Sequence, residues 1–178
     1  MKTAAINSAI DAAYWFYDKA DNENAMLETK KVQALLFFAQ AKYALENNMK
    51  YFMPCVFICN KDGFCETNVE KVLAQGKPLL ATASVGEKES AFLEKIWKEY
   101  GKYSAIELSE MVKKTASYKN CFHNSAKNVV QLNSMVENFI DDSNIGEDVK
   151  TSSVDGKVLL SQNGPVVVSS WKPRKLGV

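Results

Sequence analysis

The sequence predicts a mostly α-helical fold: a compact helical domain that carries one small antiparallel β-sheet. Three observations indicate this class. Apolar residues recur at helical spacing in several segments, serine–glutamate pairs open two of these segments at capping-box spacing, and β-branched runs near the C-terminal end flank an Asn-Gly turn. The chain has 178 residues, 47% of them hydrophobic and 24% charged, an ordinary globular mixture for about one domain.

The strongest helical pattern runs from Thr29 to Asn47, and we expect it to form the central helix. Its apolar residues follow the i, i+3, i+4, i+7 spacing of one helix face. They are Val32, Leu35, Leu36, Ala39, Tyr43 and Ala44. Phe37 and Phe38 widen this face, so we expect the helix to be buried on most sides.

Two further helices are predicted on either side of a tight corner at Gly101–Tyr103. The first covers 84–100 and begins with the capping-box spacing of Ser84–Glu87. Gly101 stands where a glycine in the left-handed conformation usually ends a helix. The second begins with another capping box, Ser104–Glu107.

Shorter elements fill the rest of the first 142 residues. Helices are predicted over 4–20, from Thr67 to Gln75 and over 131–142. Met53–Cys59 is expected to be extended, and Lys61–Gly63 has the Asp-Gly chemistry of a turn.

The C-terminal segment changes character. Val158–Ser161 and Val166–Ser169 flank an Asn-Gly turn and predict a hairpin. A lone hairpin is marginal in water, so we expect it to join Met53–Cys59 in a three-stranded sheet. It then either completes the core or docks on a partner through its basic end. The predicted organisation is a helical domain over 1–142, a polar linker or loop over 143–156, and the hairpin with a basic tail over 157–178, packed on the same domain.

Composition narrows the classes of function. The N-terminal residues lack the continuous apolar core of a signal peptide, and no apolar run approaches the ~18 residues of a membrane span. We therefore expect a cytoplasmic protein with reduced cysteines and no membrane partner. With 22 basic and 21 acidic residues and a formal charge of +1, nucleic acid is not an expected partner.

Few residues could carry chemistry. The single histidine, His123, lies two positions after Cys121. Because catalytic Cys–His pairs usually come from distant segments, we interpret His123 as a solvated or hydrogen-bonded loop residue. Cys55, Cys59 and Cys65 lack the Cys-x-x-Cys spacing of zinc sites, so Cys55 and Cys59 are expected in the core of a strand. No nucleotide-binding motif occurs. We expect no enzyme, no metal and no cofactor.

Aromatic residues and arginine are enriched at binding hot spots. The candidates for contact with a partner are Trp15, Phe64, Trp171, Lys172 and Arg174. Trp15 belongs to Tyr14–Tyr17, which is aromatic around a whole helical turn, so that part of this run must be core. The basic residues near the C-terminal end are usual for a solvated tail.

Three sequence blocks resemble the Panacea domain proteins, also described as phage-associated or SocA-like antitoxin domains. The first is LETKKVQALLFFAQA at Leu27–Ala41, and the more specific second is FLEKIWKEYGKYSAIELS at Phe92–Ser109. The third, an extended segment with a glycine turn and a short helix, lies between them, and the likeness covers about residues 5–142. Members commonly carry Gly-Pro-Val at the turn, where this chain has Gly63–Cys65.

The resemblance implies a mostly helical fold and an antitoxin of a bacterial toxin–antitoxin system, which neutralises a protein toxin by direct binding. It also implies an alternative, an adaptor or accessory protein of a mobile element that recruits a partner, for example by delivering it to a protease. Both work without catalytic residues. The matched residues are expected to be core or corner positions: Leu35, Leu36, Ala39, Trp97, Tyr100, Gly101 and Leu108.

Overall fold

The structure is a computed structural model that describes residues 4–75, 85–123, 129–140, 156–161 and 164–169. The chain divides into a helical unit, residues 1–143, and a hairpin unit, residues 144–178. The helical unit contains, in order, α1 (Ala9–Asn22), α2 (Thr29–Glu46), β1 (Phe57–Asn60), β2 (Gly63–Glu66), α3 (Thr67–Leu73), α4 (Glu87–Tyr100), α5 (Ala105–Lys114), α6 (Ala116–His123) and α7 (Leu132–Ile140). The predicted class, mostly helical with a small antiparallel sheet, is confirmed.

The hairpin unit consists of β3 (Gly156–Ser161) and β4 (Gly164–Ser169), paired antiparallel with Leu160 opposite Pro165. The strands predicted around the Asn-Gly turn are therefore present. Its packing on the helical domain stays a prediction. Most of the predicted linker and the whole basic tail lie outside the described residues.

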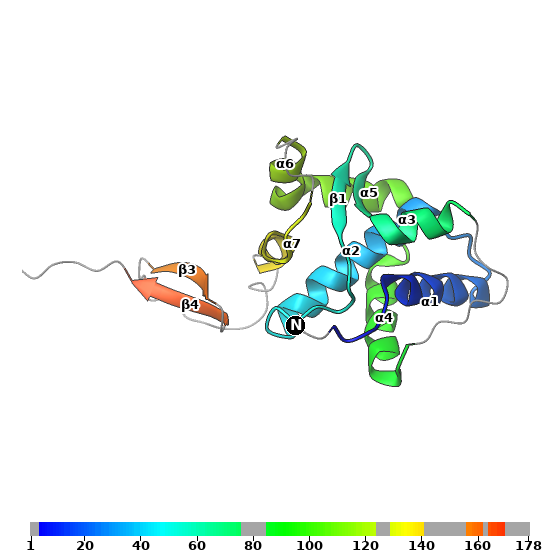
Figure 1. Cartoon of the computed structure of the whole chain (residues 1–178), viewed down its shortest axis with the longest axis horizontal. Helices are drawn as coiled ribbons and strands as arrows, with labels where there is room; N and C mark the ends of the chain where they lie inside the picture. The colour runs from blue at the N-terminus through cyan, green and yellow to red at the C-terminus, as the bar shows by residue number, and fades with distance from the viewer. Residues whose placement is uncertain (1–3, 76–84, 124–128, 141–155, 162–163, 170–178) are drawn as a thin grey trace, which may run out of the picture. The chain divides into compact units, whose positions relative to one another are not determined.

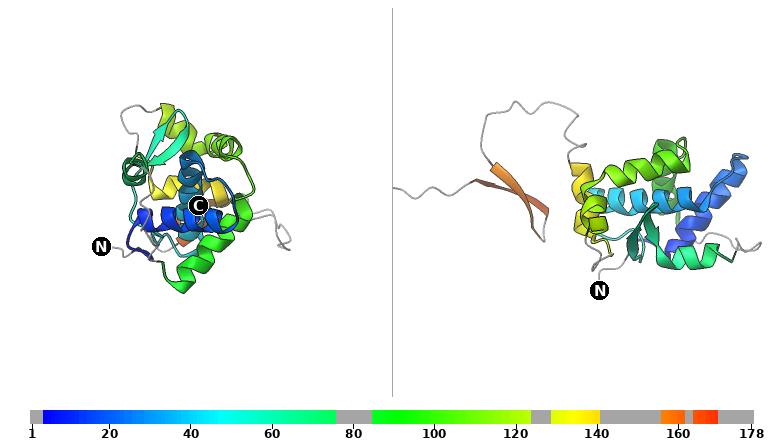
Figure 2. Two further views of the ribbon diagram at one scale, coloured as in Figure 1. Left: turned by 90° about the vertical axis from the view of Figure 1, so that its right-hand side faces the viewer. Right: turned by 90° about the horizontal axis from the view of Figure 1, so that it is seen from above.

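Helix α2 is the centre of the helical unit (Figures 1 and 2). It packs against α1, α3, α4, α5, α7 and β2, and every residue from Val32 to Ala41 is buried. A helix that is apolar on nearly all sides belongs in the interior, so the prediction of a helix buried on most sides is confirmed. Aromatic pairs fix its neighbours: Phe38 stacks on Tyr100 with ring centroids 4.2 Å apart, and Phe37 lies 4.5 Å from Phe64.

Helix α1 begins later than the sequence predicts. The side chain of Ser8 accepts the N–H of Ile10 at 3.0 Å and caps the helix, whereas the predicted start was residue 4. The residues before it bond to the segment after α2 instead, because the Ala5 N–H donates to the Tyr51 carbonyl at 3.1 Å and the Ile6 N–H to the Phe52 carbonyl at 2.9 Å. That pairing buries Ile6 against the core.

Of the two predictions for the corner between α4 and α5, one is confirmed and the other is wrong. The capping box of α5 is present, with the Ser104 N–H on the Glu107 carboxylate at 2.7 Å and the Glu107 N–H on the Ser104 hydroxyl at 3.2 Å. Gly101, however, has φ −62°, a right-handed conformation rather than the predicted left-handed one. Glycine is needed here for a close approach, since a Cβ would lie 2.5 Å from the Trp97 carbonyl oxygen.

Other boundaries also differ from the predictions. Helix α4 begins at Glu87 with Gly86 at its N-cap, and no side chain caps it. Helix α3 is capped by the side chain of Glu66, which accepts the Val69 N–H, and not by Thr67. Helix α6 was not predicted, and His123 is its last residue rather than a loop residue.

The sheet of the helical unit differs most from expectation. Strand β1 pairs with β2 through a two-residue turn, with Ile58 opposite Cys65, and β2 was not predicted. Cys55 precedes β1 and is half-buried, so of the two cysteines predicted in a strand core only Cys59 lies in one. On the other edge of β1, Ile58 bridges Val129 and the Val130 N–H donates to the Phe57 carbonyl at 2.9 Å. Both edges of β1 are thus occupied within the helical unit, one by β2 and the other by 129–130, so the prediction that β3 and β4 join this segment in a three-stranded sheet is wrong.

The remaining core predictions hold: all the matched residues of α2, α4 and α5 are buried, and Gly101 lies at the corner. Among the described residues, none of the helices combines the length and the apolar character needed to cross a bilayer.

Leu36→Ala tests the central position of α2. Leu36 has no exposed surface, and truncating a buried leucine costs ~2–5 kcal/mol because a cavity remains. We expect that loss in the free energy of unfolding, measured by urea denaturation. Met26→Ala is the control, since Met26 is 91% exposed. A loss below ~1 kcal/mol for Leu36→Ala would show that this face of α2 is not core.

Candidate functional site

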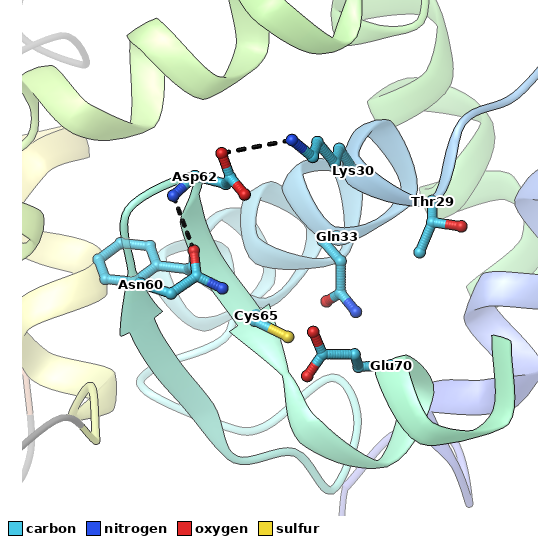
Figure 3. Close-up of a pocket in the computed structure, with 8 residues that line it drawn as sticks. Thr29, Lys30, Gln33, Asn60, Asp62, Cys65 and Glu70 are labelled. Atoms are coloured by element: carbon cyan, nitrogen blue, oxygen red, sulfur yellow. Dashed lines mark hydrogen bonds and ion pairs between the residues drawn. The ribbon is translucent and has the colours of Figure 1, made fainter. Parts of the chain in front are cut away.

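A small pocket opens where the first turn of α2 meets the β1–β2 hairpin and α3 (Figure 3). Its lining residues are Thr29, Lys30, Gln33, Asn60, Asp62, Phe64, Cys65 and Glu70, and its volume is about 100 Å³. Thr29, Lys30 and Gln33 come from one side of α2, because positions three and four apart on a helix are neighbours. In Figure 3 the side chains of Gln33, Cys65 and Glu70 point toward a common space.

The turn of the hairpin forms one wall of this pocket and is held from two sides. The Lys30 ammonium lies 3.3 Å from the Asp62 carboxylate, and the Ser109 hydroxyl of α5 donates to the Asp62 carbonyl at 2.5 Å. Within the turn, the Asn60 side-chain oxygen accepts the Asp62 N–H at 2.9 Å. Gly63 closes the turn with φ +132°, which favours glycine.

The floor of the pocket is fixed by the amide side chain of Gln33, which bonds to the backbone of β2 as a neighbouring strand would. The Gln33 side-chain oxygen accepts the Glu66 N–H at 2.7 Å, and its nitrogen donates to the Glu66 carbonyl at 3.3 Å. The Glu66 carboxylate is fully buried and accepts the N–H groups of Val56 at 3.1 Å and Val69 at 2.8 Å. We call this set of bonds the Gln33–Glu66 clamp, and it joins α2, β2 and α3.

The thiols near the pocket are not activated as nucleophiles. Burial, and then a hydrogen bond to the Glu70 carboxylate, raises the pKa of Cys65 to about 12. Burial, and then the Glu66 charge, raises the pKa of Cys55 to about 12. Because the thiolate is the reactive form, both side chains stay protonated near neutral pH.

The pocket is small for a cofactor. Sites for drug-sized molecules span ~300–1,000 Å³, several times the volume of about 100 Å³ found here. In the part of the chain that the structure describes, no three side chains of the His, Cys, Asp and Glu types gather as a metal would require. The space and its mixed charge fit a single polar side chain of a protein partner.

An apolar surface, which the sequence did not predict, lies on one face of the sheet. Val56 and Ile58 point to the same face because side chains alternate along extended chain, and Val129 sits directly opposite Ile58. Val56 is 45% exposed, Val129 is 48% exposed and Ile58 is half-buried. We call these three residues the β1 strip. Val129 lies more than 70 residues after Val56, so no local sequence pattern predicts the strip.

On the face of β1 that carries Cys59, opposite to the strip, α6 packs through two contacts of Tyr118. Its carbonyl accepts from the Cys59 thiol at 3.9 Å, and its hydroxyl donates to the Asn60 carbonyl at 2.8 Å. Phe122 follows Cys121, stacks on Tyr118 with centroids 5.5 Å apart, and is 52% exposed.

Of the five residues that the sequence predicts to contact a partner, the structure describes two, Trp15 and Phe64, and both pack within the helical unit. Trp15 is half-buried, its indole N–H donates to the Ser90 hydroxyl of α4 at 2.8 Å, and it packs edge-on against Phe16. Phe64 is 5% exposed between Phe37 and Tyr118, and it lines the pocket. The other three candidates, Trp171, Lys172 and Arg174, lie outside the described residues.

Comparison with known proteins adds no relative: no protein-family model, curated protein or solved structure matches the chain.

Gln33→Leu tests the clamp beneath the pocket. The change keeps a similar volume but leaves the buried Glu66 N–H without its partner and the Glu66 carbonyl with only the Cys65 thiol at 3.8 Å, and an orphaned buried group costs ~1–3 kcal/mol. We expect a loss of ~2 kcal/mol or more in the free energy of unfolding. Lys30→Ala, at the mouth of the same pocket, removes an ion pair whose lysine is 64% exposed and should cost less than ~1 kcal/mol. Equal losses for the two variants would contradict this role of Gln33.

Proposed function

We propose that this protein is a cytoplasmic antitoxin that neutralises a protein toxin by direct contact, with the β1 strip at the centre of the contact surface. The β1 strip is the observation that carries the proposal. Apolar residues scattered singly are normal on a protein surface, whereas a contiguous exposed group marks a site of interaction. Val56 and Val129 are exposed, and Ile58, which pairs with Val129, is half-buried on the same sheet face.

Two further features support a protein as the partner. Phe122 is a large exposed aromatic ring on α6, and aromatic side chains supply much of the energy at interfaces. The pocket beside the hairpin has room for one side chain and carries the polar groups of Lys30, Asp62 and Glu70 at its wall. An apolar centre with polar groups at its border is the usual anatomy of a protein interface.

The antitoxin role itself draws on the resemblance of the two helical blocks. The residues that carry it support the fold rather than the contact surface: Trp97 donates to the Glu23 carboxylate at 2.9 Å, and the Lys31 ammonium donates to the Gly101 carbonyl at 2.6 Å. These bonds hold α1, α2 and α4 around one corner. The scaffold is thus separate from the surface that would bind the toxin, which suits a family whose members neutralise varied toxins.

Val129→Asp tests the proposal. A carboxylate in the middle of an apolar contact must be desolvated without a partner, so we expect the toxin to bind at least ~30-fold more weakly, a loss of ~2 kcal/mol or more. The assay expresses the product of the gene next to that of this protein, scores growth arrest, and asks whether the chain restores growth. Binding of the two purified proteins is measured by calorimetry.

Ile106→Asp is the matched control. Ile106 is 77% exposed on α5, outside the β1 strip, and its variant should restore growth as well as the unchanged chain. Equal rescue by Val129→Asp would remove the β1 strip from the proposal, and a harmless neighbouring gene product would contradict the antitoxin role. An adaptor would be recognised by a fall in the amount of the partner that requires both this chain and a cellular protease.

A further inference from the structure

The outer edge of β2, the edge turned away from β1, carries backbone groups that point toward α2. Along an antiparallel strand, the backbone groups of successive residues alternate between the two edges. The Glu66 N–H and carbonyl are bonded to the Gln33 side chain, whereas the Thr67 N–H, one residue later, donates to the Val56 carbonyl on the β1 side. Phe64, two residues before Glu66, therefore presents its own N–H and carbonyl on the outer edge, as Glu66 does.

These two backbone groups of Phe64 lie at the pocket between α2 and the hairpin. Phe64 is one of the residues that line the pocket, and it is 5% exposed. No described residue forms a hydrogen bond with its outward N–H or carbonyl. Because buried backbone groups are almost always paired, this position suits a ligand that supplies one donor and one acceptor together.

Gln33 shows which chemical group pairs with such a position. At Glu66 its amide oxygen accepts the N–H at 2.7 Å, and its amide nitrogen donates to the carbonyl at 3.3 Å. A carboxylate offers only acceptors, and an ammonium or guanidinium group offers only donors, so each would leave one group of Phe64 unpaired. A partner's β-strand does not fit either, because Gln33 already occupies the next position along the edge.

The size and the charge of the pocket agree with an amide ligand. Its volume of about 100 Å³ equals that of about three water molecules at ~30 Å³ each, which suits the end of one asparagine or glutamine side chain. Lys30 is paired with Asp62 at 3.3 Å, and Glu70 adds a further carboxylate to the lining. This surplus of negative charge disfavours a carboxylate as the ligand.

We propose that this pocket binds the side-chain carboxamide of an asparagine or glutamine from a protein partner, paired with the Phe64 N–H and carbonyl as Gln33 is paired with Glu66. The amide of the partner and that of Gln33 would then follow each other along the outer edge of β2. The identity of this partner as the toxin rests on the proposed function, whereas the recognition of an amide does not.

The test titrates the isotope-labelled full-length chain with an acetylated and amidated Gly-Asn-Gly peptide and follows backbone N–H signals by nuclear magnetic resonance. We expect the Phe64 N–H signal to move downfield and to saturate, because a new hydrogen bond deshields the proton. The Gly-Leu-Gly peptide has the same backbone and should cause no such shift. The Gly-Asp-Gly peptide, which lacks the donor, should bind ~10-fold more weakly, the effect of one lost hydrogen bond.

Thr29→Phe closes the pocket without altering the Gln33–Glu66 clamp. Thr29 is the exposed first residue of α2 and lines the pocket, so an aromatic ring there should abolish the shift caused by the asparagine peptide. Glu87→Phe is the matched control. It places the same ring at the exposed first residue of α4, which does not line the pocket, and should leave the shift unchanged.

The proposal is wrong if the asparagine peptide causes no saturable shift at Phe64, or if the leucine peptide causes an equal one. Neither result involves the toxin, so both are independent of the outcome for the β1 strip. With the toxin, Thr29→Phe should weaken binding ~10-fold in calorimetry while Glu87→Phe should not. Equal toxin binding by these two variants would show that the toxin does not supply the amide.

Discussion

The helical unit depends on one constraint: the stretch Val32–Ala41 of its central helix is entirely buried and yet carries two amide side chains. Gln33 meets this constraint by pairing both polar atoms of its amide with the backbone of Glu66, which fixes β2 against α2 and places the buried carboxylate that caps α3. The amide of Gln40 is hydrogen-bonded only in part. Its oxygen accepts the Met53 N–H, while its nitrogen has no partner among the described residues. The sheet, the pocket and the start of α3 are therefore positioned by polar atoms within an apolar helix.

This arrangement separates the scaffold from the surfaces proposed to act. The corner at Gly101 and the aromatic contacts of α2 use residues with little exposure, so their role is to hold the helices together. The β1 strip and Phe122 lie instead on the strand and on the short helix next to it.

How much the sequence could predict depends on whether a local pattern decides the structure. Helix α2 and the capping box at Ser104 were predicted well, because apolar spacing and capping chemistry act within a few residues. Strand β2 was missed because Gly63–Glu66 has no alternation of polar and apolar residues, and all four are buried by contacts from distant segments. Gly101 was assigned the wrong conformation because proximity of the Trp97 carbonyl, not backbone handedness, demands glycine there. The β1 strip was missed because it forms only when Val129 pairs with Ile58, which lies far from it in the sequence, and no local pattern predicts such a pairing.

The Gln33–Glu66 clamp also affects how the protein behaves at high concentration. An open strand edge offers its N–H and carbonyl groups to strands of other molecules, and natural sheets usually block such edges. Here the outer edge of β2 is occupied at Glu66 by an amide side chain, and the outer edge of β1 is occupied at Phe57 by Val130. At these two positions the β1–β2 sheet offers no free backbone group to a strand of another molecule. The same glutamine that organises the fold thus contributes to its colloidal stability.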